Sequence, residues 1–310
     1  MTGRLIALLV ALVLILLVAA ALAIAWKPAI APVAPPQAAS FDQALVRRGA
    51  ALAEMGNCIA CHTAPGGKTL AGGRALPSPF GTIFSTNITP DADTGIGGWS
   101  EEAFQRSMRE GVDRAGRHLY PVFPYDRFTL LTDDDNKALY AYLMTREPVR
   151  AQTPANELRF PFNIRIGLAA WKLLFLHKGP YQPDRSQSDA WNRGAYLVEG
   201  IAHCGACHTP RDALGAERRG EPLAGGEAEG WTAYALNQAS PAPVPWDARA
   251  CILSEERLAR SARHIPWPDG RGHAEPRLDF RFRGGGHGHI YNECDGRADG
   301  AAAQARRGGA

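Results

Sequence analysis

The sequence predicts an all-α fold in which two homologous helical domains stand in tandem behind a membrane-spanning N-terminal helix. An uninterrupted apolar run fills residues 5–25. A cysteine–histidine motif occupies residues 58–62 and recurs at residues 204–208. Apolar residues at helical spacing precede each motif, so a helix is expected to lead into each one. A chain of 310 residues is long enough for two such domains.

The apolar run is long enough to cross a hydrocarbon core of about 30 Å as a helix. Small residues at 19–25 would also suit a signal peptidase, so residues 1–26 are either a membrane anchor, which we favour, or a signal peptide. Both alternatives send the remaining chain out of the cytoplasm. Arg4, on the short N-terminal side, favours a location at the cell inner membrane with the body on the periplasmic side.

Residues 27–40 are rich in Pro and Ala and predict a semi-extended spacer that holds the globular part away from the bilayer. The first domain is expected to cover residues 41–147. The formal net charge is +3, and no basic stripe with interleaved aromatic residues occurs before the C-terminus. Nucleic acid is therefore not an expected partner.

Both motifs read C-x-x-C-H, the spacing that attaches a c-type haem covalently. Cys58 and Cys61 would form thioethers to the porphyrin edge, and His62 would give the iron its proximal nitrogen. The same roles fall in the second motif to Cys204, Cys207 and His208. The sequence therefore predicts two covalently bound haem c groups and a function in electron transfer, with no side chain needed as an acid, base or nucleophile.

Two other interpretations of the motifs remain open at this point. Four cysteines and two histidines could bind zinc, although zinc-ligand pairs usually sit closer in sequence and free thiols are uncommon outside the cytoplasm. A pair of thioredoxin-type disulfides would give no reason for histidine in the same position twice. Haem is the favoured interpretation.

The first domain is expected to contain further helices after its motif. Residues 66–90 are rich in Gly and Pro and predict a loop that wraps an edge of the haem without a core of its own. Ser100 predicts a capped helix that ends near Gly111. Another helix is predicted after residues 132–135 and ends before Pro148.

Residues 148–188 are expected to connect the domains, with an apolar helix at 164–176 that packs across both of them or lies on the bilayer where a quinone arrives; we favour packing. The second domain, residues 189–250, lacks the sequence of a closing helix. Residues 251–310 are dominated by Arg and Gly and predict disorder. We expect a truncation or frame shift near residue 250, or else a natural basic tail.

Several long segments resemble the membrane-bound multihaem cytochrome c subunits of bacterial periplasmic dehydrogenases, which oxidise alcohols, sugars, sugar acids such as gluconate, aldehydes or N-heterocycles such as nicotinate. The resemblance covers most of residues 45–246. The matching segments are residues 79–91, 94–100, 118–121, 123–125, 138–144, 160–163 and 179–181. It implies tandem cytochrome c domains that are not catalytic alone. Electrons would pass from a periplasmic dehydrogenase catalytic subunit to ubiquinone or a terminal oxidase.

The distal ligand of the first haem is not evident from the motifs. Members of the family resembled often carry Met where this chain has Phe123, so His118 and Met108 are the remaining candidates. His118 is preferred because its loop would face the distal side, and two histidine ligands would lower the potential. The second haem has only remote candidates, His264, His273, His287 and His289.

Two other classes of function are kept as alternatives. Missing methionine ligands would suit a dihaem peroxidase-like enzyme in which one iron keeps an open position for its substrate. A haem-based sensor or a maturation intermediate would carry no electron flux. Peroxide turnover discriminates the first, and rapid reduction by a co-purifying dehydrogenase would exclude the second.

Overall fold

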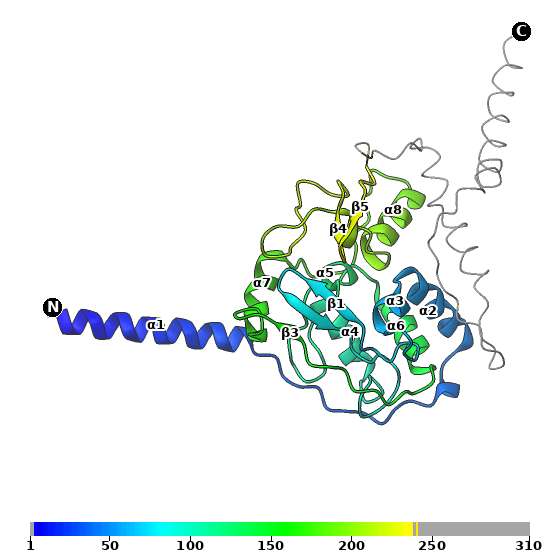
Figure 1. Cartoon of the computed structure of the whole chain (residues 1–310), viewed down its shortest axis with the longest axis horizontal. Coiled ribbons are helices and arrows are strands. Elements are labelled where there is room, and N and C mark those ends of the chain that lie inside the picture. Colours follow the sequence, from blue (N-terminus) through cyan, green and yellow to red (C-terminus); the bar gives the residue numbers. More distant parts are fainter. Residues whose placement is uncertain (1–2, 238–239, 241–310) are drawn as a thin grey trace, which may run out of the picture. The chain divides into compact units, whose positions relative to one another are not determined.

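The computed structural model describes residues 3–237 and residue 240 (Figure 1). Helices dominate, but short strands are present too, so the all-α expectation is too simple. The helices are α1 (Gly3–Ala25), α2 (Gln43–Met55), α3 (Cys58–His62), α4 (Glu101–Glu110), α5 (Tyr125–Phe128), α6 (Asp133–Met144), α7 (Leu168–Phe175), α8 (Asp189–Tyr196) and α9 (Gly205–His208). Three other helical turns are η1 (Ala38–Ser40), η2 (Arg165–Gly167) and the π-helical η3 (Leu197–Ile201). The strands are β1 (Ala75–Ser78), β2 (Gly81–Phe84), β3 (Glu157–Leu158), β4 (Gly226–Ala228) and β5 (Trp231–Ala233).

The predicted apolar run forms one helix, α1, of 23 residues. Its side chains are exposed along their length, and only Ala25 at its C-terminal end is buried. By length and composition α1 can cross a membrane, a test that a signal sequence also passes.

The segment that follows α1 is extended, but it lies along the first domain instead of acting as a free spacer. The Ile30 amide donates to the Arg114 carbonyl at 2.8 Å, and the Arg114 guanidinium donates back to the Ile30 carbonyl at 3.2 Å. The Val33 amide donates to the Gly98 carbonyl at 3.1 Å. These bonds hold the chain against the domain from its first residues after α1.

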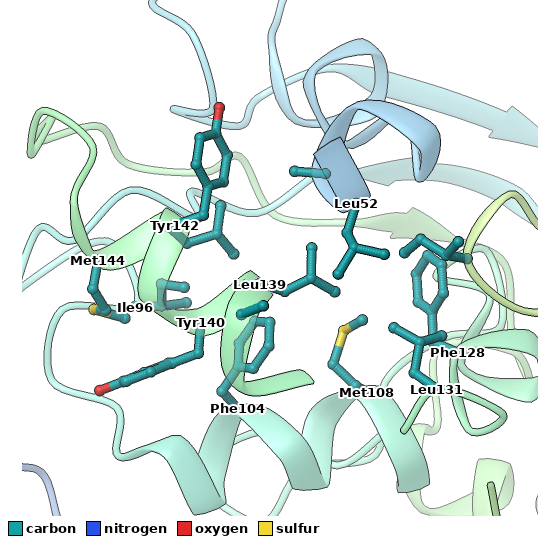
Figure 2. Packing of buried hydrophobic residues seen from close by; sticks show 14 of the residues in the cluster. Leu52, Ile96, Phe104, Met108, Phe128, Leu131, Leu139, Tyr140, Tyr142 and Met144 are labelled. Carbon is teal, nitrogen blue, oxygen red and sulfur yellow. The ribbon is translucent and has the colours of Figure 1, made fainter. Parts of the chain in front are cut away.

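The core of the first domain forms where α2 crosses α6 at close range. A Cβ atom on Gly49 would lie 1.9 Å from the Ala138 carbonyl oxygen, so only glycine permits this approach. Leu52 and Leu139 meet beside the crossing, and Met108 from α4 lies beneath them (Figure 2). The packing of α2 on α6 fixes the position of the end of α2, after which α3 begins at Cys58.

Capping side chains fix where the helices of the first domain begin. Ser100 accepts a hydrogen bond from the Ala103 amide at the start of α4, and Gly111 ends that helix with φ at 59°. Thr132 accepts from the Asp135 amide at the start of α6. The helix start at Ser100 and the end at Gly111 are confirmed.

Two small antiparallel sheets follow the two motifs. In the first, β2 pairs with β1 on one side and β3 on the other, so the predicted wrapping loop contains a hairpin. β3 comes from the predicted interdomain connection. A Cβ on Gly81 would meet the Glu157 carbonyl at 2.2 Å, and a φ of 126° also favours glycine there. The second sheet is the β4–β5 hairpin.

The second domain repeats the helical approach to its motif through α8, η3 and α9. Ser188 caps α8 by accepting from the Trp191 amide at 3.2 Å. The predictions for the second domain beyond residue 240, for the residue 250 boundary, for the tail and for its four histidines lie outside the described residues.

Candidate functional site

The first motif forms α3, and a frame of backbone contacts holds its histidine. The His62 Nδ1 donates to the Thr86 carbonyl at 2.7 Å. The His62 carbonyl accepts from the Gly72 amide at 2.8 Å. Thr63 accepts from the Leu70 amide at 3.1 Å. Since a carbonyl can only accept, Nδ1 carries the hydrogen and the neutral ring leaves its Nε2 lone pair free.

The second motif repeats this frame contact by contact. The His208 Nδ1 donates to the Tyr234 carbonyl at 2.6 Å, and the Gly225 amide donates to the His208 carbonyl at 2.8 Å. Thr209 accepts from the Leu223 amide at 3.0 Å. The loop lengths between the partners differ, but the bonds are the same. The internal repeat seen in the sequence is thus also a repeat of hydrogen bonds.

The residues just before and after the motifs also correspond in backbone conformation. Asn57 and His203 precede the first cysteines with φ at 50° and 40°. Leu70 and Leu223, whose amides donate to the threonines, have φ at 62° and 56°. Left-handed φ is uncommon for residues other than glycine. Matching occurrences at four positions indicate that both loops are built for the same task.

These contacts fit covalently attached haem. Each motif presents two thiols and an imidazole whose Nδ1 is engaged, which is how metal-ligating histidines are usually oriented. Burial is the first cause that lowers the pKa of His62, and a neutral imidazole is the form that binds iron. Cys58, Cys61, Cys204 and Cys207 are all free of disulfides. Burial is also the first cause that raises the pKa of each of these four thiols, the opposite of what a reactive thioredoxin-type pair requires.

The two motifs face one another across an ion pair. The Arg74 guanidinium binds the Glu229 carboxylate at 2.6 Å, joining the first loop to the β4–β5 turn. Burial is the main cause that raises the pKa of Cys61; Arg74 lowers it, and Glu229 and Cys207 raise it further. The second cysteines of the two motifs, Cys61 and Cys207, therefore lie within electrostatic range of each other. Sequence reasoning missed this pair because nothing local links residues 155 positions apart.

A second ion pair ties α5 to the second motif. Arg127 binds Glu217, and its Nε donates to Oε1 at 3.2 Å. A Cβ on Gly205 would lie 2.7 Å from the Arg127 guanidinium, which explains glycine after the first cysteine of this motif. The motif sequence gives no signal for either contact.

Both ring nitrogens of His118, the preferred distal candidate, already have hydrogen-bonding partners in the structure. Its Nε2 donates to the Ala25 carbonyl at 2.7 Å, and its Nδ1 lies 3.0 Å from the Lys172 Nζ, which also donates to the Gly111 carbonyl at 2.6 Å. Burial lowers the pKa of His118, and the ring is neutral with both nitrogens engaged. His118 therefore has no ring nitrogen to offer in this arrangement.

Met108 is buried in the core cluster against which Cys58 packs, at 6% exposure. Figure 2 shows its thioether between Leu139 and Leu131, among apolar side chains. Phe123 packs on the Phe128 ring at 5.3 Å between centroids. The two candidates for the sixth ligand therefore lie in different surroundings. His118 is hydrogen-bonded to the end of α1, and Met108 is buried in the core.

No group of three or more His, Cys, Asp or Glu side chains placed to hold a metal ion occurs within residues 3–237. The two C-x-x-C-H motifs therefore do not combine into a zinc site there.

Comparison with known proteins decides the family. The family model described as cytochrome c matches residues 46–147. A diheme cytochrome c-type protein of Cereibacter sphaeroides is 37% identical over 214 residues, covering 65% of this chain and 69% of the relative. The chain belongs to the cytochrome c family. Membership of the cytochrome c family implies covalently bound haem c.

Two longer relatives of this cytochrome c carry names of dehydrogenase subunits. A nicotinate dehydrogenase subunit of Pseudomonas putida is 55% identical over 227 residues, covering 73% of this chain and 19% of that protein. The fructose dehydrogenase cytochrome subunit of Gluconobacter japonicus is 46% identical over 207 residues, covering 66% of this chain and 43% of the relative. The chain spans less than half the length of either relative.

Proposed function

We propose that this cytochrome is the electron-transfer subunit of a dehydrogenase complex and holds two haem c groups. Its thioether ligands would be Cys58, Cys61, Cys204 and Cys207, and its proximal iron ligands His62 and His208. The observation that carries the proposal is the hydrogen-bond frame repeated around both histidines, which leaves one Nε2 lone pair free in each motif.

The side chains of this protein fix the geometry, while the bound haem iron supplies one-electron redox chemistry. The Thr86 and Tyr234 carbonyls hold the two imidazoles in one tautomer. The Arg74–Glu229 pair joins the loop after the first motif to the β4–β5 turn after the second, so an ion pair as well as the backbone connects the two motif loops. Two redox centres exchange electrons only when they are close together, and this contact supports such an arrangement.

The proposed partner and location are supported by the relatives and by α1. Relatives named as cytochrome subunits of dehydrogenases support a periplasmic dehydrogenase catalytic subunit as electron donor. An exposed apolar α1 supports attachment to the inner membrane with the body on the periplasmic side. The acceptor that we propose is ubiquinone or a terminal oxidase. The chain itself would not be catalytic alone.

For the sixth ligand of the first haem we favour Met108 over His118. Both ring nitrogens of His118 are engaged, whereas Met108 belongs to the hydrophobic core cluster against which Cys58 packs. A far-red charge-transfer band that disappears in Met108→Leu would support Met108. A spectrum without that band, combined with peroxide turnover, would instead support the peroxidase-like alternative with an open iron position.

Covalent haem is tested by mass spectrometry of the exported full-length protein. We expect the mass of two haems in the parent protein. Removing both cysteines of one motif, as Cys58→Ala with Cys61→Ala, should leave one haem, and Cys204→Ala with Cys207→Ala should leave the other. A parent protein without added haem mass would overturn the proposal.

Electron transfer is tested with the dehydrogenase that co-purifies with the chain. Its substrate should reduce both haems rapidly, and reduction should be lost at one haem in each double-cysteine variant. Haems that dithionite reduces but the dehydrogenase does not would leave the haem sites intact and contradict the role as its electron acceptor.

A further inference from the structure

The short helix α7 buries its charged side chain and exposes apolar ones, the opposite of a surface helix of a water-soluble protein. Lys172, its basic residue, is only 8% exposed, whereas the neighbouring Leu173 and Leu174 are 76% and 63% exposed. Trp171 turns inward, with its ring 6.1 Å from Tyr125 between centroids. A helix that buries its charge and exposes its leucines faces an apolar environment.

The buried side of α7 is bonded to the end of α1. The Lys172 Nζ lies 3.0 Å from His118 Nδ1, and the His118 Nε2 donates to the Ala25 carbonyl at 2.7 Å. Arg165 of η2 donates to the His118 carbonyl at 2.9 Å. Two side chains thus join α7 to the last residue of the apolar helix.

The residues directly after α1 are also bonded to the body, so no flexible linker separates α1 from α7. Arg106 donates to the Pro28 carbonyl at 2.8 Å, and a Cβ on Gly116 would lie 2.1 Å from the Lys27 carbonyl oxygen. Residues 27–33, the first part of the expected spacer, are thus held against the body by these contacts and by the backbone bonds of Ile30 and Val33. If α1 crosses the bilayer, α7 lies beside the end of α1, because Lys172 and His118 connect the two helices.

The stretch leading into α7 adds further exposed apolar side chains. Large ones with at least 40% exposure are Phe160, Phe162, Ile164 and Ile166, and Trp26, directly after α1, is exposed too. Basic residues accompany them: Arg165 and Arg219 both donate to backbone carbonyls. Exposed apolar groups beside cations match the boundary between acyl chains and anionic headgroups.

We propose that Ile164, Ile166, Leu173 and Leu174, called here the α7 face, rest in the surface layer of the phospholipid bilayer. The proposal rests on the proposed role of α1 as a retained membrane anchor. It adds a second point of attachment, so the body has a fixed orientation on the membrane. Trp171 Nε1 donates to the Leu214 carbonyl at 3.0 Å, which carries that orientation to the loop after the second motif. An acceptor in the membrane would then meet the second haem domain at a constant height.

The test uses the full-length haem protein in vesicles made of equal parts phosphatidylethanolamine and phosphatidylglycerol. A phospholipid with a photoactivatable group in its acyl chain is included, and adducts are mapped by mass spectrometry after illumination. We expect adducts on Leu173, Leu174 and residues 160–166 as well as on α1. Trp191 on α8, which is 50% exposed, should carry none above background.

A paired variant keeps the test decisive. Leu173→Glu with Leu174→Glu should abolish most adducts on α7 and leave those on α1, whereas Trp191→Glu should change neither. Adducts confined to residues 3–25 would overturn the proposal. Haem content and dithionite reduction are recorded on each sample, so a failure of the α7 face is distinguished from a failure of the haem sites.

Discussion

Asp135 is the residue that joins three elements of the first and second domains. It is 1% exposed, its carboxylate binds the Arg48 guanidinium of α2 at 2.7 Å, and it accepts from the Tyr196 hydroxyl of α8. Burial and this bond raise the pKa of Tyr196 to about 12. Asp135→Asn should therefore lower the free energy of unfolding by about 2 kcal/mol, measured by chemical denaturation.

The neighbouring Asp134 is the matched control for that change. It belongs to the same helical turn and is exposed. Asp134→Asn should alter the free energy of unfolding by less than about 0.5 kcal/mol. If the two variants lose equal stability, the loss comes from the charge at the helix start and not from the buried contacts of Asp135.

Lys172 makes stability depend on pH. Burial is the first cause that lowers its pKa from 10.5 to about 7. The unfolded chain therefore holds a proton on this residue between those values that the folded chain has released. Stability should rise with pH across that window, by up to about 1.4 kcal/mol per pH unit from this group.

The measurement is the unfolding free energy of the parent protein and of Lys172→Met at several pH values. The unfolding free energy of the parent protein minus that of Lys172→Met should rise as the pH goes from 7 toward 10.5, because the parent protein gains stability that the variant cannot gain. Lys68→Met serves as the control, since Lys68 is exposed and paired with Glu147. A difference independent of pH would contradict a lysine that is neutral when folded.

Among the elements, the same sequence position is packed in one domain and open in the other. Gly49 and Gly194 occupy equivalent places in the repeated helices, each preceded by Arg and followed by Ala. A Cβ on Gly49 would strike the Ala138 carbonyl of α6, whereas one on Gly194 meets nothing within 4 Å in the described residues. The described part of the second domain thus lacks the partner that α6 provides in the first.

This asymmetry gives a paired prediction. Gly49→Ala should force α2 away from α6 and cost about 2 kcal/mol or more of unfolding free energy. Gly194→Ala should cost nothing or gain about 0.5 kcal/mol, because alanine favours the helix over glycine. Thermal and chemical denaturation followed by far-ultraviolet circular dichroism measure both. An equal loss at Gly194 would contradict the open surroundings found there.

Across the whole molecule, the Arg74–Glu229 pair links the loops of both motifs. Arg74→Gln removes a positive charge near the two proposed haem sites and should lower their midpoint potentials, since the oxidised iron carries the larger positive charge. Glu229→Gln should raise them. Shifts on the order of tens of millivolts are expected for a partly exposed charge, measured by spectroelectrochemical titration.

The exposed pair Arg150 and Asp93 supplies the control for that titration. Arg150→Gln changes the net charge by the same amount as Arg74→Gln. Its effect on both potentials should be clearly smaller, because screened surface charges act weakly at a distance. Equal shifts in the two arginine variants would mean that net charge alone matters, and that the place of Arg74 between the motifs does not.

Local patterns in the chain were enough to predict the two C-x-x-C-H motifs, the apolar α1 and the capped start of α4, whereas the helix expected after residues 132–135 begins already at Asp133. Each is written in residues a few positions apart, where spacing alone decides which side chains meet. The proposal of His62 and His208 as proximal ligands rests on the same local spacing. The backbone carbonyls that orient the two rings could not be predicted, because every residue has a carbonyl and no side chain distinguishes these two.

Contacts between residues far apart in the chain became visible only in the folded structure. It engages both nitrogens of His118 with Ala25 and Lys172, pins the segment after α1 to the first domain, and pairs Arg74 with Glu229. The partners in these contacts are separated by 54 or more positions. Packing of the whole domain brings such groups into contact, and no local pattern in the sequence predicts which distant residues will be partners.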